Sequence, residues 1–161
     1  MVATNHRTYV YIGLGGEGDY IGEGGLVRRA DGEEEWTDVS KGLPDKPQVR
    51  ALAIRPDDPK IVFAGTDKGV YRSKDRGENW EALNDAAPGY EVWSLILHPD
   101  NPNVIFAGYD SCSISRSQDG GDTWKMMDTS AVVHPFITTY MPPLAKRVIG
   151  MSFDPSDTND I

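Results

Sequence analysis

The chain has 161 residues, of which 39% are hydrophobic and 25% charged, enough for one domain with a sizeable core; this excludes a disordered or collagen-like protein. A formal net charge of −9 would repel a phosphate backbone, so we expect no nucleic-acid partner. No apolar run reaches the roughly 18 residues of a membrane helix, and residues 1–8 lack the apolar core of a secretory signal. We therefore expect a cytoplasmic protein, or the mature fragment of a secreted one, with no membrane partner.

Metal and disulfide chemistry have little support in the sequence. Cys112 is the single cysteine, which rules out an internal disulfide, and CxxC pairs are absent. The three histidines, His6, His98 and His134, lack the spacing of metal ligands. We predict neither a metal site nor a cofactor.

The first predicted unit spans about residues 8–39. A β-rich segment at 8–12 opens it, and a glycine-rich stretch at 15–25 follows. The unit ends in a degenerate turn motif that keeps Asp31 and Trp36. It reads as three strands.

The second unit spans about residues 49–85 and reads as four short strands, which we name A to D. These segments are rich in β-branched and aromatic residues and are bounded by Pro, Gly, Asp and Asn. The expected strands are 49–55, 61–66, 69–73 and 79–83. Strands C and D are joined by the motif S-x-D-x-G-x-x-W, formed by Ser73, Asp75, Gly77 and Trp80.

The third unit spans about residues 92–128 and aligns with the second almost throughout. Residues 52–59 correspond to 95–102, and residues 61–65 correspond to 104–108. Residues 148–154 match strand A once more, so the strand inventory is BCD, ABCD, ABCD, A. The turn motif of the third unit is formed by Ser117, Asp119, Gly121 and Trp124.

Three residue types recur in one register across the units. Trp36, Trp80 and Trp124 are spaced by 44 residues, and two further series keep the same spacing. No segment shows a sustained helical period. Four-stranded antiparallel units repeated without helices predict an all-β fold, a β-propeller with about three blades in residues 1–161. The two further series are Asp31, Asp75, Asp119 and Arg28, Arg72, Arg116.

The turn motif resembles the Asp-box, or BNR, repeat of sialidases, sortilin-type receptors and xyloglucan-cleaving glycosidases, propellers with YVTN-like repeats. The resemblance covers most of the chain and implies a structural turn. Asp and Ser side chains accept hydrogen bonds from nearby backbone N–H groups, Gly permits positive φ, and Trp holds the hairpin on its sheet. We expect the recurring arginines to be architectural as well, because each unit has one.

Three blades cannot close a ring, and open sheet edges favour association. We therefore expect a second polypeptide to complete a ring of six to eight blades. One possibility is the C-terminal half of a chain about twice as long; the other is an identical chain, so that residues 148–154 complete the BCD unit of its partner and two copies make six blades. The sequence favours the longer chain, because Ile161 stops inside a predicted strand.

The turn motifs and the A–B turns at 56–59 and 99–102 are expected on one rim, with the B–C turns and D–A links on the other. The second rim departs from the repeat in its turn at 15–25 and its link at 129–147. Such loops on a rigid scaffold line ligand sites, or pack their own side chains. The ligand-binding candidates are Tyr20, Tyr109, His134, Tyr140 and Arg147.

Four carboxylates on the second rim are the catalytic candidates: Asp19, Glu23, Asp67 and Asp110. Two carboxylates across a cleft can act as general acid and base on a glycosidic bond. Residues 66–72 resemble the T-D-x-G-x-Y-R segment that carries a catalytic Asp in xyloglucan-cleaving propellers, and the same segment also occurs in their non-catalytic blades. Sialidase activity is not expected, because only Arg50 and Arg147 are placed on this rim and no arginine triad can be assembled.

Three functions remain open from the sequence. A ligand-binding or assembly module, for a carbohydrate, a small molecule or a protein, is favoured because no complete catalytic set can be assembled. A glycosidase-like hydrolase is the alternative, and a metal-dependent propeller enzyme is the weakest. Fold alone does not choose among them.

Overall fold

The computed structural model describes residues 7–15, 24–84, 87–110, 112–129 and 147–154. These residues form eleven β-strands and no helix. Nothing in them is a helix long and apolar enough to span a membrane. The strands are β1 Tyr9–Leu14, β2 Gly25–Ala30, β3 Thr37–Asp38, β4 Ala51–Ile54, β5 Val62–Thr66, β6 Gly69–Ser73, β7 Glu81–Ala82, β8 Val92–Leu97, β9 Ile105–Tyr109, β10 Ile114–Ser117 and β11 Lys125–Met126.

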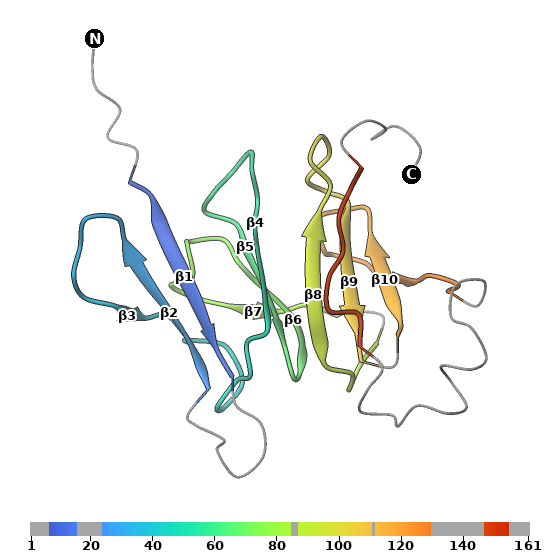
Figure 1. Ribbon diagram of the computed structural model, residues 1–161, viewed down its shortest axis with the longest axis horizontal. Coiled ribbons are helices and arrows are strands. Elements are labelled where there is room, and N and C mark those ends of the chain that lie inside the picture. Colours follow the sequence, from blue (N-terminus) through green and yellow to red (C-terminus); the bar gives the residue numbers. More distant parts are fainter. Residues whose placement is uncertain (1–6, 16–23, 85–86, 111, 130–146, 155–161) are drawn as a thin grey trace.

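The strands form three antiparallel sheets, which we call blades 1, 2 and 3. Blade 1 has the order β1-β2-β3, blade 2 the order β4-β5-β6-β7 and blade 3 the order β8-β9-β10-β11. Figure 1 shows the blades side by side along the longest axis, with blade 2 in the middle. The all-β architecture and the BCD, ABCD, ABCD strand inventory agree with the sequence.

Two predicted strands differ from the structure. The strand expected at 79–83 forms only at Glu81–Ala82, because the backbone N–H of Asn79 is bound by Asp75 of the turn instead of a neighbouring strand. The strand A expected at 148–154 is not formed in these residues. Arg147 makes only an isolated antiparallel bridge with Asp110.

Strand pairing shows which residues of the three blades are equivalent. In each blade an aromatic residue of strand B lies opposite the recurring arginine of strand C, although the first blade has a longer turn between them. The pairs are Tyr11–Arg28, Phe63–Arg72 and Phe106–Arg116. Equivalence therefore rests on hydrogen-bond register as well as on spacing.

Two hydrophobic clusters join the blades. At each boundary three side chains of one blade, its trailing face, pack on the leading face of the next. The first boundary has Tyr11, Leu26 and Val39 against Val62, Ala64 and Trp80. The second has the equivalent residues Phe63, Val70 and Leu83 against Ile105, Ala107 and Trp124.

A glycine of strand B marks each boundary. A Cβ on Gly65 would lie 2.6 Å from Cγ1 of Val92, and a Cβ on Gly108 would lie 2.6 Å from Cγ1 of Val148. Gly13 faces Val49 in the same way. Val148 thus holds the place of Val49 and Val92, so residues 148–154 follow the path of a next strand A without forming one.

The S-x-D-x-G-x-x-W turns, which we call the motif turns, have the hydrogen bonds that their residue types predict. Ser73 Oγ accepts from the backbone N–H of Gly77 at 2.7 Å, and Asp75 Oδ1 accepts from that of Asn79 at 2.9 Å. The second motif turn repeats both bonds through Ser117 and Asp119. The motif glycines have φ of 91° and 97°.

The recurring arginines connect neighbouring blades. Arg28 donates to the carbonyl oxygen of Arg76 at 2.6 Å and pairs with Glu78, both in the motif turn of blade 2. Arg72 makes the equivalent bonds in blade 3, to the carbonyl of Gly120 at 2.9 Å and to Asp122 at 2.8 Å. We call this contact the arginine clamp.

Substituting Gly65 by alanine tests the blade contact. The new Cβ would lie 2.6 Å from Val92 Cγ1, and Val92 is fully buried, so we expect a loss of about 1–3 kcal/mol in the free energy of unfolding. Urea unfolding measures it. Gly150→Ala is the control, because its Cβ would have no neighbour within 4 Å. Equal stability of the two variants would contradict the close contact.

The second motif turn is expected to make a contribution to stability that is lost in acid. Hydrogen bonds from Thr123 and Ser117 lower the pKa of Asp119 to about 2, below the roughly 3.9 of an unfolded aspartate. Ionised Asp119 therefore stabilises the fold above about pH 4, and this contribution is lost as the pH falls toward 2. The Tm difference between wild type and Asp119→Asn should shrink over this range.

Asp31→Asn is the matched control for this measurement. Asp31 occupies the same repeat position, but Arg29 stands where the motif turns have serine. The same pH dependence of the Tm difference for both variants would show that the motif hydrogen bonds do not cause it.

Candidate functional site

The two ends of the blades have different chemistry. At one end each motif turn bonds to the A–B turn of its blade, from Arg76 N to Lys60 O and from Gly120 N to Asn103 O, each at 2.9 Å. This confirms that the two kinds of turn share a rim. The B–C turns at Asp67 and Asp110 lie at the opposite end, against the links that enter β4 and β8. The sequence places its functional candidates on this opposite rim.

Two of the predicted catalytic carboxylates on the opposite rim accept hydrogen bonds from backbone N–H groups. Asp67 Oδ1 accepts from the N–H of Gln48 at 3.0 Å, and Asp110 Oδ1 accepts from the N–H of Glu91 at 3.1 Å. Both bonds span 19 residues, so the two carboxylates are equivalent. The other oxygen of Asp67 lies 3.2 Å from Lys68 Nζ. In both blades the carboxylate fixes the link that enters strand A.

Tyr109 was wrongly placed among the ligand-binding candidates. Its side chain is fully buried in the cluster between blades 2 and 3, and its hydroxyl lies 2.7 Å from Ser115 Oγ. The alternation of strand β9 turns this residue inward, although it directly precedes a rim turn.

Five other predicted residues fall outside the described part of the chain. They comprise two catalytic and three ligand-binding candidates, and their roles remain predictions: Asp19, Glu23, Tyr20, His134 and Tyr140.

Arg147, the remaining ligand-binding candidate, belongs to a cluster on the opposite rim. Its guanidinium carbon lies 3.8 Å from the centre of the Trp93 ring, and that of Arg50 lies 4.5 Å from it. We call Arg50, Trp93 and Arg147 the arginine–tryptophan cluster. Each cation gains from the negative face of the indole, by about 0.5–2 kcal/mol.

A β-bulge positions the ring of this cluster. Val92 pairs with Tyr109 and Ser94 with Gly108, so Trp93 is the extra residue in strand β8. A bulge redirects a side chain out of the regular alternation, a device frequent next to binding sites. Arg50 is the equivalent residue of blade 2, immediately before β4, and Arg147 comes from the segment after blade 3.

Two hydrogen-bond donors of the cluster have no acceptor. Arg50 Nη1 and Trp93 Nε1 are buried without a partner among the described residues. The other terminal nitrogen of Arg50 lies 3.4 Å from Glu91 Oε2. Unsatisfied buried donors each cost about 1–3 kcal/mol, so a ligand oxygen that accepted from them would be strongly favoured. The cluster therefore suits a ligand with carboxylate or carbonyl oxygens.

Trp93 was missed by the sequence analysis, although a signal was present. It is the one tryptophan of the four that stands outside the 44-residue series. The repeat alignment gives Trp93 the position that Arg50 holds in the preceding unit, at the start of strand A. A change of residue type at a repeated position can indicate a specialised site.

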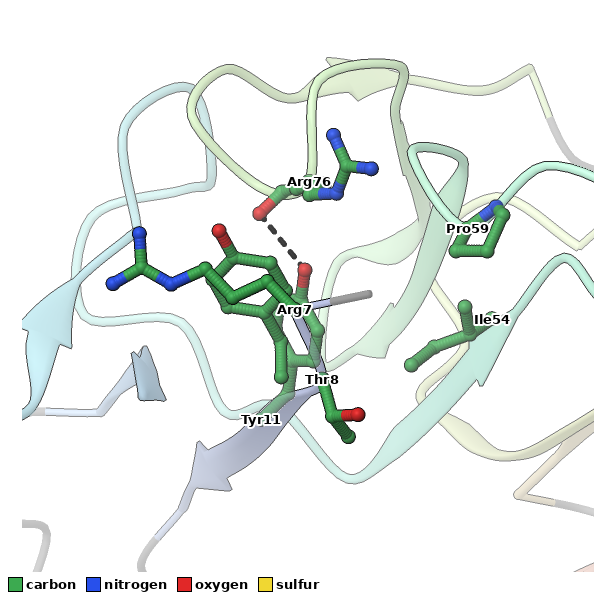
Figure 2. A pocket seen from close by; sticks show the side chains of 7 residues that line it. Arg7, Thr8, Tyr11, Ile54, Pro59 and Arg76 are labelled. Atoms are coloured by element: carbon green, nitrogen blue, oxygen red, sulfur yellow. Dashed lines mark hydrogen bonds between the residues drawn. The ribbon is translucent and has the colours of Figure 1, made fainter. Parts of the chain in front are cut away.

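A pocket of about 570 Å³ lies between blades 1 and 2, at the rim that carries the motif turns. Figure 2 shows Tyr11 bonded through its hydroxyl to the carbonyl of Arg76, with Ile54 and Pro59 across the pocket. Three guanidinium groups surround the Tyr9 ring at 4.9–5.9 Å, those of Arg7, Arg28 and Arg76. The pocket is cationic and aromatic. Within the described residues, no three His, Cys, Asp or Glu side chains gather as metal ligands would.

Comparisons with known proteins address the fold. No protein-family model matches the sequence, and no curated protein is similar to it. Among solved structures, the GH74 xyloglucanase from Xanthomonas campestris is 19% identical with a TM-score of 0.55, over 75% of this chain and 22% of that one. An ancestral GH74 enzyme is 20% identical with a TM-score of 0.55, over 64% and 15%.

A second group of similar structures consists of YCF48 proteins. YCF48 from Cyanidioschyzon merolae is 18% identical with a TM-score of 0.52, over 65% of this chain and 34% of that one. YCF48 bound to D1 peptide is 18% identical with a TM-score of 0.54, over 68% and 35%. This chain thus spans 15–35% of the length of these four structures. At such identities the likeness concerns the fold: the chain is an all-β, partial β-propeller.

Proposed function

We propose that this chain is a binding module of the Asp-box propeller class and that its arginine–tryptophan cluster takes an acidic segment of a polypeptide partner. The observation that carries the proposal is a pair of buried donors, Arg50 Nη1 and Trp93 Nε1, which have no acceptor in the described part of the chain and lie beside a second cation, Arg147. A carboxylate would accept hydrogen bonds and neutralise charge at once.

The solved structures support this class of function by analogy. One of the similar propellers, YCF48, has been solved with a D1 peptide. Peptides carry carboxylates and backbone carbonyls, which could accept hydrogen bonds from Arg50 Nη1 and Trp93 Nε1. A propeller rim is also a rigid platform, so little ordering of the protein opposes binding.

The described carboxylates give less support to hydrolysis. Asp67 and Asp110 each bind a backbone N–H, and a residue that does the same task in two blades is better explained by architecture than by catalysis. A glycosidase needs two carboxylates facing a common cleft. The similarity to xyloglucanases makes this alternative worth a direct assay.

Binding should be measured with a fluorescein-labelled peptide of alternating Glu and Ala, by anisotropy at low salt. Arg147→Gln and Trp93→Ala are expected to weaken binding about tenfold, or ~1.4 kcal/mol. Trp93→Phe keeps the ring and removes the N–H, so it should weaken binding by a smaller factor. Affinity should fall with added salt.

Arg55→Gln is the matched control for the binding assay. Arg55 lies near the rim of the motif turns and pairs with Asp57 at 2.7 Å, so its loss removes the same charge at a remote place. Equal weakening by Arg55→Gln and Arg147→Gln would indicate an effect of net charge and overturn the proposed site. A Lys-Ala peptide should not bind.

The hydrolase alternative is tested with xyloglucan and the variants Asp67→Asn and Asp110→Asn. We expect the wild type to release no oligosaccharide. Asparagine keeps an oxygen for the N–H of Gln48 or Glu91, so both variants should stay folded and retain peptide binding. Xyloglucan cleavage that either variant abolishes would replace the binding module by a glycosidase.

A further inference from the structure

The leading face of blade 1 is apolar and uncovered. Val10, Ile12 and Trp36 hold the repeat positions of Val62, Ala64 and Trp80, and they are 46%, 41% and 38% exposed. In blades 2 and 3 the same positions lie within the inter-blade clusters. The face has the composition of a blade boundary, and none of the three described blades packs on it.

The trailing face of blade 3 is open in a complementary way. Phe106, Ile114 and Met127 hold the positions of Phe63, Val70 and Leu83, which blade 3 covers in blade 2. Here they line a groove of about 220 Å³ together with Met151 and Phe153. The Phe153 ring already packs on Phe106, with centroids 5.7 Å apart.

The third arginine clamp is empty within the described residues. Arg28 and Arg72 bind the next motif turn, whereas the Arg116 guanidinium makes no hydrogen bond or ion pair with a described residue. It lies 5.7 Å from the centre of the Phe106 ring, and its Nε is buried without an acceptor among the described residues. The repeat positions that would receive it are the carbonyl of Gly32 and the carboxylate of Glu34, both in blade 1. They correspond to Gly120 and Asp122.

We propose that these two faces bind each other between two copies of this chain, so that two three-blade arrays close one six-bladed ring. Blade 3 of each copy receives blade 1 of the other, through two identical contacts related by the propeller axis. A head-to-tail contact makes a closed ring when its rotation returns to the start. The proposal is independent of the ligand of the arginine–tryptophan cluster.

Residues 148–153 supply the missing inner strand of this contact. They lie along blade 3, where Val148 N donates to Tyr109 O at 3.0 Å and Ser94 Oγ donates to Val148 O at 2.6 Å. Strand β1 is an edge of its sheet, so its free backbone groups can pair with them. The register of β4 with β5 then places Met151 opposite Ile12 of the second copy.

The charges at one repeat position favour a second copy of this chain over another kind of blade. In blade 2, Arg55 follows strand A, and its Nη1 lies 3.5 Å from the position that a Cβ on Gly120 of the next motif turn would occupy. In blade 1 the equivalent strand residue would be Asp154 of the second copy, and the equivalent of Gly120 is Arg76. Asp154 would therefore meet Arg76 at the cationic pocket of Figure 2. Opposite charges on the two sides favour this pairing.

The test is the solution mass of the 161-residue chain by light scattering across a concentration series. We expect twice the chain mass of 17.7 kDa. Arg116→Glu and Glu34→Arg should each raise the dimer dissociation constant by about tenfold, and the double variant should restore it, because opposite charges face again. Arg116→Glu with Glu35→Arg is the control and should not be rescued. Circular dichroism verifies that each variant is folded.

A cross-link tests the register. In a Cys112→Ser background, Ile12→Cys with Met151→Cys should oxidise to one covalent dimer on a non-reducing gel, whereas Ile12→Cys with Ser152→Cys should react more slowly. A monomeric mass of the wild type would overturn the proposal and favour a further blade from another polypeptide. A ladder of higher oligomers, a trimer, or failure of the charge swap would overturn it as well.

Discussion

The spacing of the blades depends on the absence of a side chain at one position of strand B. Gly13, Gly65 and Gly108 let Val49, Val92 and Val148, which hold one repeat position, approach the backbone of the preceding blade. Close packing of this kind allows little adjustment, so each boundary repeats the same geometry. The hydrophobic clusters and the arginine clamps then add to a contact whose distance is already set.

The arginine–tryptophan cluster depends on this same constraint. Val92 lies against Gly65, and the bulge follows immediately at Trp93. Arg50 comes from the preceding blade and Arg147 from the segment that follows blade 3, so three consecutive parts of the repeat meet at one aromatic ring. The proposed binding surface is therefore held in place by the same contacts as the blade boundaries.

The repeat could be predicted from the sequence because it depends on local residue types at fixed spacing. Strand C of blade 2 and the motif turns around Asp75 and Asp119 formed as expected. The cluster could not be predicted, because a bulge and a cation–π contact depend on how segments 43 and 97 residues apart in sequence, from Arg50 to Trp93 and to Arg147, approach in space. Tyr109 failed for a related reason: its position in the alternation of a strand decided burial, while its place before a turn suggested exposure.

The equivalence of the two blade boundaries also bears on how such proteins evolve. Each boundary uses the same small set of positions, so the duplication of one whole unit would create a new boundary with both of its faces already matched. Loss of a unit would be tolerated for the same reason. The number of blades in a chain can then change by whole units during evolution while each sheet stays intact. The rotation between neighbouring blades decides how many blades close a ring, so selection for a closed ring would fix the total.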